Sequence, residues 1–415
     1  AFNPYLGWMC GWGAVLATII VLSNLAGVAV TFLYLLLGQV TGSPELAALG
    51  EHPVVDVLTC LAFLAVATVI SYRGVTTTAR LQYVLVGFQM LVLVAFAALA
   101  IGKATTGASA TTLAFDPSWM DLTAVPTLSA FTAGLSLSIF IYWGWDTSLT
   151  VNEETTGSAR TPGRAALLTI AVIVATYLVV AIAAQMFAGV GTAGIGLGNP
   201  DTADNVFAAL AGPVLGDDLA FLLFLAVLAS SAASLQTTFL PPARTLLAMA
   251  TYRALPARFA RVHPRYRTPS FATLAAGIAT GVFYAAMTAI SENVLIDTIY
   301  ALGLMICFYY GLTAYACVWY FRRELRRSAR DMLFTGVLPL AGAIMLTLAF
   351  VQTAVDTMDP AYGSGSSVFG VGSVFVIGVG LLAFGVVLMI LQRLRHPEFF
   401  RGETLHRHTP SLVVD

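Results

Sequence analysis

Long apolar runs recur along almost the whole of this 415-residue chain. A membrane-spanning helix needs roughly 20 consecutive, predominantly apolar residues. Ten runs approach or exceed that length, near residues 8–38, 54–72, 80–102, 125–156, 163–190, 218–250, 270–290, 296–321, 332–353 and 368–392. In hydrocarbon every backbone polar group has to be paired, and a helix pairs them within its own segment. We therefore predict an all-α integral membrane protein with about ten transmembrane helices.

The composition supports the same conclusion. Hydrophobic residues make up 58% of the chain and charged residues only 10%. Soluble domains carry roughly 25% charged residues, so we expect this chain to need a lipid bilayer as its solvent and partner. The formal net charge is −1 and no basic face is visible, which argues against a nucleic-acid partner.

Arginine residues lie on alternate connections between the runs. The opposite connections carry acidic residues, with Lys103 as their only base. Cytoplasmic loops of membrane proteins carry an excess of Lys and Arg. We therefore predict a multi-pass protein of the cell membrane whose arginine side is cytoplasmic, with both ends of this sequence on that side. The arginines after the even-numbered runs include Arg73, Arg80, Arg160, Arg164, Arg253, Arg258, Arg261, Arg322, Arg323, Arg393 and Arg395.

Residue patterns for chemistry are sparse. The four cysteines all lie in apolar runs, where a thiol usually acts as a small core side chain. The five histidines lie at the edges of runs, in connections or in the tail, so we expect no metal site and no cofactor. An intramembrane enzyme would need paired carboxylates, a histidine cluster or a Ser/His set at depth, and the sequence offers only one central acid. We therefore expect no catalytic residues.

That acid, Asp146, lies in the fourth run beside Gly144, which stands between Trp143 and Trp145. An acid at the middle of a membrane helix costs roughly 2.5–3.5 kcal/mol on insertion scales. Glycine among aromatic residues also has weak helix propensity. We predict that the helix is broken at residues 142–146 and exposes polar backbone groups to a cavity. The alternative is a continuous helix with Asp146 solvated near the inner surface, and we interpret residues 153–154 as its cytoplasmic end.

Hydroxyl-bearing side chains gather in the sixth run, at Ser230, Ser231 and Ser234. Such hydroxyls coordinate a small cation or hydrogen-bond another helix, and the sequence leaves both interpretations open. Pro241 and Pro242 follow and lack backbone donors, so we predict a kink near the end of this run.

Polar side chains also occur inside two other runs, at Asn24 and Gln89. Each needs a hydrogen-bonding partner, either on a neighbouring helix or on a ligand. We interpret Tyr309 and Tyr310 as core aromatics, and residues 363–367 as an external loop.

Several motifs resemble one known family. The match covers nearly the whole chain, and the motifs are Gly144-Trp145-Asp146, Glu153-Glu154-Thr155, Pro162, Ala165, Met249-Ala250, Ala254-Leu255-Pro256, Phe259, His263-Pro264 and Thr268-Pro269, with Gly7, Gly11 and Trp12 nearer the start. They resemble the signatures of the amino acid–polyamine–organocation (APC) superfamily, and most closely its actinobacterial-type amino acid permeases.

The resemblance implies a LeuT-like (APC) inverted-repeat transporter fold. Our first run then matches the family's third helix, so this sequence lacks the family's first two helices and the glycine-rich segment that holds a substrate carboxylate there. The chain would form one transmembrane domain over residues 1–395, followed by a cytoplasmic tail at 396–415. Within the domain, a truncated first repeat covers about 1–105, a second repeat about 122–324, and two additional helices about 330–395. The third and eighth runs would be related by an inverted pseudo-two-fold axis.

The resemblance also implies site residues. The candidate substrate contacts are the gating aromatic Phe140, the unwound segment Tyr142, Trp143, Gly144 and Trp145, the acid Asp146, and Asn24. Candidates for coupling-ion contacts are Ser230, Ser231 and Ser234, which fall near cation-site hydroxyls of sodium-coupled relatives, together with Asp146 and Gln89. Gln89 stands where several members carry a lysine, which is a departure from the family.

These features predict secondary active transport of a small molecule, an amino acid or related amine, by alternating access. Coupling would be by proton symport or exchange, with sodium as a further possibility. The alternatives are a channel and a non-transporting membrane subunit or sensor. A channel usually shows a pore helix with repeated selectivity residues or rings of charge, and none is visible.

Overall fold

The computed structural model describes residues 2–74, 79–107, 111–150, 155–157, 160–202, 205–290 and 294–405. Within these residues, nine helical segments are long and apolar enough to cross a membrane. They are α1 (Pro4–Thr41), α3 (Pro53–Arg73), α4 (Ala79–Thr105), α7 (Thr161–Ala188), α9 (Ala220–Thr238) with α10 (Leu240–Thr251), α11 (Ser270–Ile290), α12 (Val294–Phe321), α13 (Ala329–Asp331) with η9 (Met332–Val337) and α14 (Leu338–Asp356), and α15 (Ser373–Arg395). The predicted all-α multi-pass membrane fold is confirmed.

The fourth predicted run forms two shorter helices, α5 (Leu128–Ile141) and α6 (Thr147–Thr150). It is therefore not among the nine spans, whereas the sequence predicted about ten, and α5 is a shorter apolar helix. The remaining short elements lie in the connections: α2 (Pro44–Ala48), η1 (Leu49–Glu51), η3 (Pro117–Met120), η4 (Leu122–Ala124), α8 (Val206–Leu215), η7 (Asp217–Leu219), η8 (Ala257–Ala260), α16 (Pro397–Phe400) and the antiparallel strands β1 (Ser367–Val368) and β2 (Val371–Gly372). Helix α8 was not predicted, because its 10 apolar residues are too few for a span.

Helix α1 owes its length to well-formed ends. The side chain of Asn3 accepts a hydrogen bond from the Leu6 amide at 3.0 Å, and Pro4 occupies the first helical position. The helix ends at Gly42, whose φ of +67° suits glycine. Its 38 residues extend about 57 Å, nearly twice the hydrocarbon thickness of about 30 Å, so α1 crosses at a tilt or projects beyond the bilayer.

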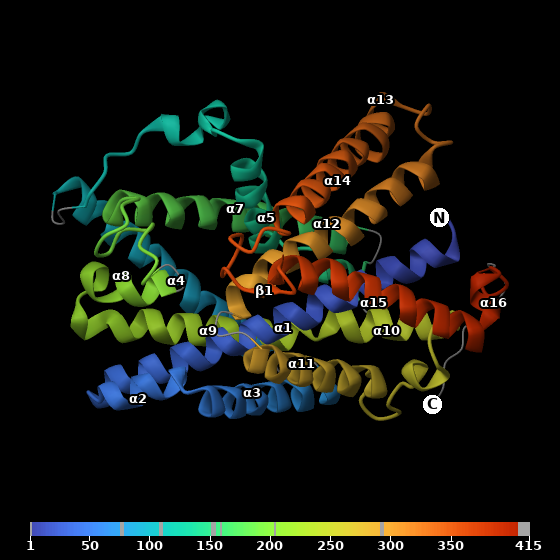
Figure 1. Ribbon diagram of the computed structural model, residues 1–415, viewed down its shortest axis with the longest axis horizontal. Coiled ribbons are helices and arrows are strands. Elements are labelled where there is room, and N and C mark those ends of the chain that lie inside the picture. The colour runs from blue at the N-terminus through green and yellow to red at the C-terminus, as the bar shows by residue number, and fades with distance from the viewer. Residues whose placement is uncertain are drawn as a thin grey trace.

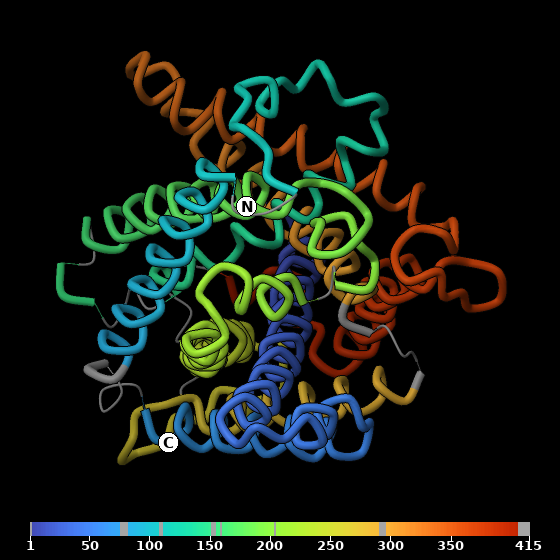
Figure 2. The backbone as a smooth tube through the Cα atoms, turned by 90° about the vertical axis from the view of Figure 1, so that its left-hand side faces the viewer, coloured from blue at the N-terminus to red at the C-terminus, as the bar shows by residue number. Residues whose placement is uncertain are grey.

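Helix α1 is also the central element of the bundle. It contacts α9 and α10 on one side and α12 and α15 on the other, and it also touches α3 and α11. Figure 1 shows it running through the middle of the molecule, with α3 and α11 side by side along one edge. In Figure 2, α9 and α10 are seen end-on beside the dark-blue α1. In its most apolar stretch 56% of α1 is buried, against 6% for α7, so α7 lies at the periphery.

Two apolar clusters lie on different sides of α1. One joins α4, α7, α8 and α9 around Phe96, Phe187 and Leu223. The other joins α1 to α12 around Ile20, Met305 and others. A further cluster joins α1 to α3, α9 and α11, so α1 takes part in the packing of most of the bundle.

The sixth run is interrupted at one residue, Phe239, just before the proline pair for which a kink was predicted. Pro241 and Pro242 stand in the first turn of α10 and provide no backbone donors there. Phe239 nevertheless keeps helical dihedral angles, with φ −68° and ψ −19°. In the view of Figure 1 the two helices run end to end almost along one line, so the interruption changes the direction of the chain little in that view.

Candidate functional site

The break between α5 and α6 falls at residues 142–146, as predicted. Helix α5 begins at the capping residue Thr127, whose side chain accepts from the Ala130 amide, and it ends at Ile141. Gly144 has a φ of +96°, a region that L-residues rarely adopt. A Cβ atom placed on Gly144 would meet no atom within 4 Å, so the residue does not act as a packing contact between helices.

Backbone donors become free at this break. The Tyr142 amide still donates to Ser138 O at 3.0 Å, and the Thr147 amide donates to Gly144 O at 3.1 Å. Between them, among the described residues, the amides of Gly144 and Trp145 have no hydrogen-bond acceptor. Unpaired amides at an interrupted membrane helix are the groups that such a helix offers to an anionic ligand.

Aromatic contacts with α12 hold the broken segment in place. The indole N–H of Trp143 donates to the hydroxyl of Tyr309. The rings of Trp145 and Tyr310 lie with their centroids 6.2 Å apart. Phe140 and Trp143 also pack on the cluster shared by α1 and α12. Tyr309 is a core residue, as predicted, but it and Tyr310 have the further role of positioning the break, which sequence reasoning missed.

Asp146 is half-buried at the end of the break, and the buried hydroxyl of Tyr310 has no hydrogen-bond partner among the described atoms. Within the part of the chain that the structure describes, no lysine or arginine forms an ion pair with it. The predicted alternative, a continuous helix that leads to a solvated Asp146, is wrong, because helix α5 ends five residues before this side chain. Residues 153–154 lie outside the described residues.

Close packing fixes the α5 half of the break against α12. Ser136 is 2% exposed and lies directly against Gly303, where a Cβ atom would collide with the Ser136 hydroxyl. Only a glycine in α12 allows this approach. The Ser136 hydroxyl itself has no hydrogen-bond partner among the described atoms.

The first turn of α5 is also held by contacts with α14. The Ser129 hydroxyl donates to Asp356 Oδ1 of α14 at 3.0 Å, and Gln352 Nε2 donates to the same oxygen at 2.9 Å. Tyr362 lies nearby, and burial, followed by the neighbouring Tyr300 and Asp356, raises the pKa of Tyr362 to about 12. This tyrosine is therefore a neutral hydroxyl at physiological pH.

The structure does not bring Asn24 to the break. Asn24 is 7% exposed on α1, and its Oδ1 accepts from the Thr298 hydroxyl at 3.0 Å. Thr298 and Tyr309 are separated along α12 by about 16 Å, or roughly three turns. The Asn24 Nδ2 group is buried without a partner, so its donor remains free at that separate level.

The coupling candidates other than Asp146 lie on α4 and α9, two helices that pack against each other. Helices α4 and α9 are antiparallel: Gln82 Nε2 donates to Ala233 O at 3.1 Å, while Phe96 clusters with Leu223 further along. This register brings Gln89 to the level of Ser230. The Gln89 Oε1 atom is buried without a partner, whereas Ser231 is buried and Ser230 and Ser234 are half-buried.

A fully buried acid, Asp297, escaped the sequence reasoning. It accepts from the Ser364 amide at 2.9 Å, the Ser364 hydroxyl at 2.7 Å and the Ser373 hydroxyl at 2.6 Å. The predicted external loop at 363–367 therefore folds back onto the first turn of α12, where helix amides also favour an anion. The available signal was an acid at the edge of an apolar run. Among the described residues no group of three His, Cys, Asp or Glu side chains could hold a metal ion.

These features define an all-helical, multi-pass membrane protein with an interrupted helix beside its central core. The sequence matches the amino acid permease family over residues 1–381, and the chain belongs to that family. It is also similar to proteins named uncharacterized transporters from Mycobacterium bovis and Mycobacterium tuberculosis. Each is 26% identical over 355 residues, which cover 85% of this chain and 70% of the relative. The family and these relatives identify a membrane transporter of small molecules.

Proposed function

We propose that this chain carries an amino acid or a related amine across the cell membrane by alternating access, with the break between α5 and α6 as its substrate contact. One observation carries the proposal. At Gly144 the backbone turns with a φ of +96°, and the space beside it is open. Among the described residues the amides of Gly144 and Trp145 have no acceptor, so the break presents polar groups that a ligand can satisfy.

The chemistry of the segment fits both charged ends of an amino acid. The amides of Gly144 and Trp145 are donors suited to a carboxylate. The carboxylate of Asp146 has no described lysine or arginine partner and attracts an ammonium group. Trp143 adds an apolar surface with little conformational freedom to lose. This favours a zwitterion with an apolar or modestly polar side chain, and a cationic amine without a carboxylate is the rival substrate.

Coupling to a proton requires a group that titrates, and Gln89 does not. We propose Asp146 as the proton carrier, since it is the acidic side chain of the break. The hydroxyls of Ser230, Ser231 and Ser234, with the unpaired Gln89 carbonyl at the same level of α4 and α9, form the alternative, a contact for sodium. Simple exchange without an ion remains the third option, and the predicted orientation keeps the arginine-rich side in the cytoplasm.

The test is transport by the complete natural chain in proteoliposomes, with three matched compounds. Leucine has both charged groups, isopentylamine keeps only the amine, and 4-methylpentanoate keeps only the carboxylate. We expect saturable leucine uptake and leucine counterflow. Either truncated compound should compete at least tenfold more weakly than unlabelled leucine, since each lost ionic contact is worth about 1.4 kcal/mol or more.

Two results would change the conclusion. Competition by isopentylamine as strong as by leucine would identify an amine carrier and remove the role of the free amides. A flux that does not saturate and shows no counterflow would indicate a channel and overturn the proposal of a carrier.

A further inference from the structure

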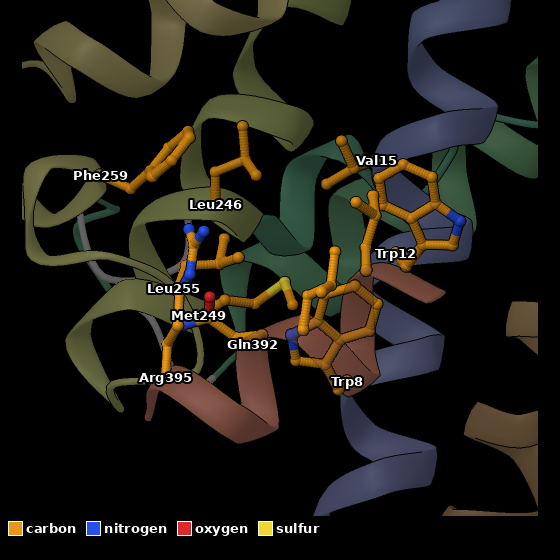
Figure 3. Close-up of a pocket in the computed structure, with 11 residues that line it drawn as sticks. Trp8, Trp12, Val15, Leu246, Met249, Leu255, Phe259, Gln392 and Arg395 are labelled. Atoms are coloured by element: carbon orange, nitrogen blue, oxygen red, sulfur yellow. The ribbon is translucent and has the colours of Figure 1, made fainter. Parts of the chain in front are cut away.

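A cavity of about 320 Å³ lies at the arginine-rich end of the molecule, away from the helix break. It is enclosed by α1, α10, α15 and the segment that follows α10 (Figure 3). Its volume is at the lower end of the range for small-molecule sites, roughly 300–1,000 Å³. None of its lining residues belongs to the candidate substrate or coupling groups.

The wall from α15 is one continuous helix face. Leu388, Leu391, Gln392 and Arg395 follow the spacing i, i+3, i+4, i+7 and all line the cavity. From Leu388 to Arg395 this face extends about 10 Å along the helix. It changes from apolar side chains to an amide and a guanidinium at the last turn of α15, so the cavity has an apolar part and a polar end.

The wall from α1 is aromatic and has no polar group left to offer. The Trp8 indole N–H donates to Ala254 O at 3.1 Å, and the Trp12 N–H donates to Leu381 O at 3.0 Å. Trp12 is also held against α15, because a Cβ atom at Gly385 would collide with its ring. Both indoles therefore turn carbon surfaces to the cavity, opposite Met249 in Figure 3. An occupant of this part has to be apolar.

The polar end is formed by an amide and a guanidinium. Gln392 is 8% exposed, and its Nε2 group has no hydrogen-bond partner in the described part of the chain. Arg395 lies beside it in Figure 3 and, among the described residues, forms no ion pair. A buried amide donor next to an arginine is suited to an anionic oxygen, and phosphate in particular.

The cavity is bordered by the side of α15 that faces lipid. Leu391 lines the cavity and is 48% exposed, and it belongs to a set of exposed apolar residues on α15. In a membrane protein such residues contact hydrocarbon. The edge of the cavity at Leu391 is therefore adjacent to the exposed apolar surface of α15, which favours a lipid over a molecule dissolved in water.

We propose that this cavity binds one anionic phospholipid of the leaflet on the arginine-rich side. One acyl chain lies between Trp8, Trp12 and Leu246, and the phosphate accepts from Arg395 and Gln392. The bound lipid joins α15 to α1 and to α10, the second half of the interrupted sixth span. This proposal does not depend on which substrate the protein carries.

The test uses the complete chain in phosphatidylcholine nanodiscs that contain increasing fractions of phosphatidylglycerol with brominated acyl chains. Bromine quenches the fluorescence of Trp8 and Trp12 when the chain enters the cavity. We expect brominated phosphatidylglycerol to quench the fluorescence in a saturable phase at low mole fraction. Brominated phosphatidylcholine should show no such saturable phase. Arg395→Gln should raise the half-saturating fraction about fivefold, which corresponds to about 1 kcal/mol for one surface charge.

Two further variants separate this site from general membrane charge. Arg393→Gln removes the same charge from the same helix turn, where Arg393 lies over the ring of Tyr5. It should change the half-saturating fraction of phosphatidylglycerol by less than about twofold. Leu246→Phe fills the cavity without altering charge and should abolish the saturable phase even if Arg395→Gln folds poorly. Equal effects of the two arginine variants, equal quenching by the two phospholipids, or undiminished quenching in Leu246→Phe would each overturn the proposal. If brominated oleate quenched the fluorescence as strongly as brominated phosphatidylglycerol, the occupant would be a fatty acid. That result would also overturn the proposal.

Discussion

Two spans of this protein are interrupted, and they differ in what the interruption does to the backbone. At Phe239 the chain keeps helical dihedral angles, and α10 continues from α9 after a single residue. At residues 142–146 the chain leaves the helix for a full turn and passes through a φ of +96° at Gly144. The proline pair removes donors, whereas the glycine break leaves donors unpaired and redirects the chain.

The comparison teaches that an interrupted membrane helix is not by itself a binding site. Phe239 is 1% exposed and surrounded by apolar neighbours, so its interruption is covered by protein. The glycine break is half-buried, contains an acid and has open space beside Gly144. The accessibility of the freed backbone groups distinguishes the two regions, and the following predictions test that distinction.

The largest effect is expected for Gly144→Leu. The new side chain occupies the open space next to the free amides, so substrate affinity should fall by more than about 100-fold, or about 2.7 kcal/mol. The positive φ should lower stability by only about 1–2 kcal/mol. Substrate binding and thermal unfolding of the same purified variant measure both quantities.

Gly134→Leu is the matched control, because Gly134 lies in α5 with no atom within 4 Å of its would-be Cβ and has no positive φ. It should bind substrate normally. If Gly144→Leu bound substrate normally in its folded fraction and lost mainly thermal stability, the glycine would have only a conformational role and the comparison would fail.

The second effect concerns Asp146→Asn, which preserves shape but cannot take up a proton. If Asp146 couples transport to protons, wild-type uptake rises as the external pH falls, and the variant should lose this dependence. At acidic pH its uptake should be at least about tenfold slower, which corresponds to about 1.4 kcal/mol. Initial uptake rates across a series of external pH values provide the measurement, and an unchanged profile would point to another acid or to exchange.

A smaller effect is expected for Trp143→Phe, which keeps the ring but removes the N–H that donates to Tyr309. One hydrogen bond contributes about 1 kcal/mol, so affinity should fall about fivefold through looser positioning of the break. Phe140→Leu offers a comparison, since Phe140 lies in the same cluster without a polar contact. If both variants reduced affinity equally, packing and not the hydrogen bond would position the segment.

The smallest effect is expected at the other interruption. Pro241→Ala restores one backbone donor at a helix start where proline is already tolerated, so stability should change by less than about 1 kcal/mol. Substrate affinity should stay within about twofold of wild type. Thermal unfolding and binding assays give these values, and a loss of binding comparable to that in Gly144→Leu would show that the two interruptions do not differ as proposed.

The sequence was sufficient to predict the long helices, because the signals for a helix are local. The length of each apolar run predicted the spans, and Gly144 between two tryptophans predicted the break at residues 142–146, since propensity and hydrophobic burial act on neighbouring residues. Pro241 with Pro242 predicted a kink, whereas the chain has a one-residue interruption at Phe239 with helical dihedral angles. The same local logic failed for α8, whose ten residues form a helix too short to be recognised as a span. The repeat boundaries and the inverted symmetry stay predictions.

Tertiary structure decided which of these residues meet. Nothing local to Tyr309 or Tyr310 indicated contact with Trp143 and Trp145, and nothing in the run of α12 indicated that Asp297 would receive a loop 67 residues away. It also separated Asn24 from the break by about three turns and brought Gln89 of α4 to the level of Ser230 of α9. The physical reason is that a helix fixes the spacing of its own side chains. Contacts between helices depend instead on their tilt, their register and the glycines that allow close approach. Tilt and register are set only when the whole bundle packs.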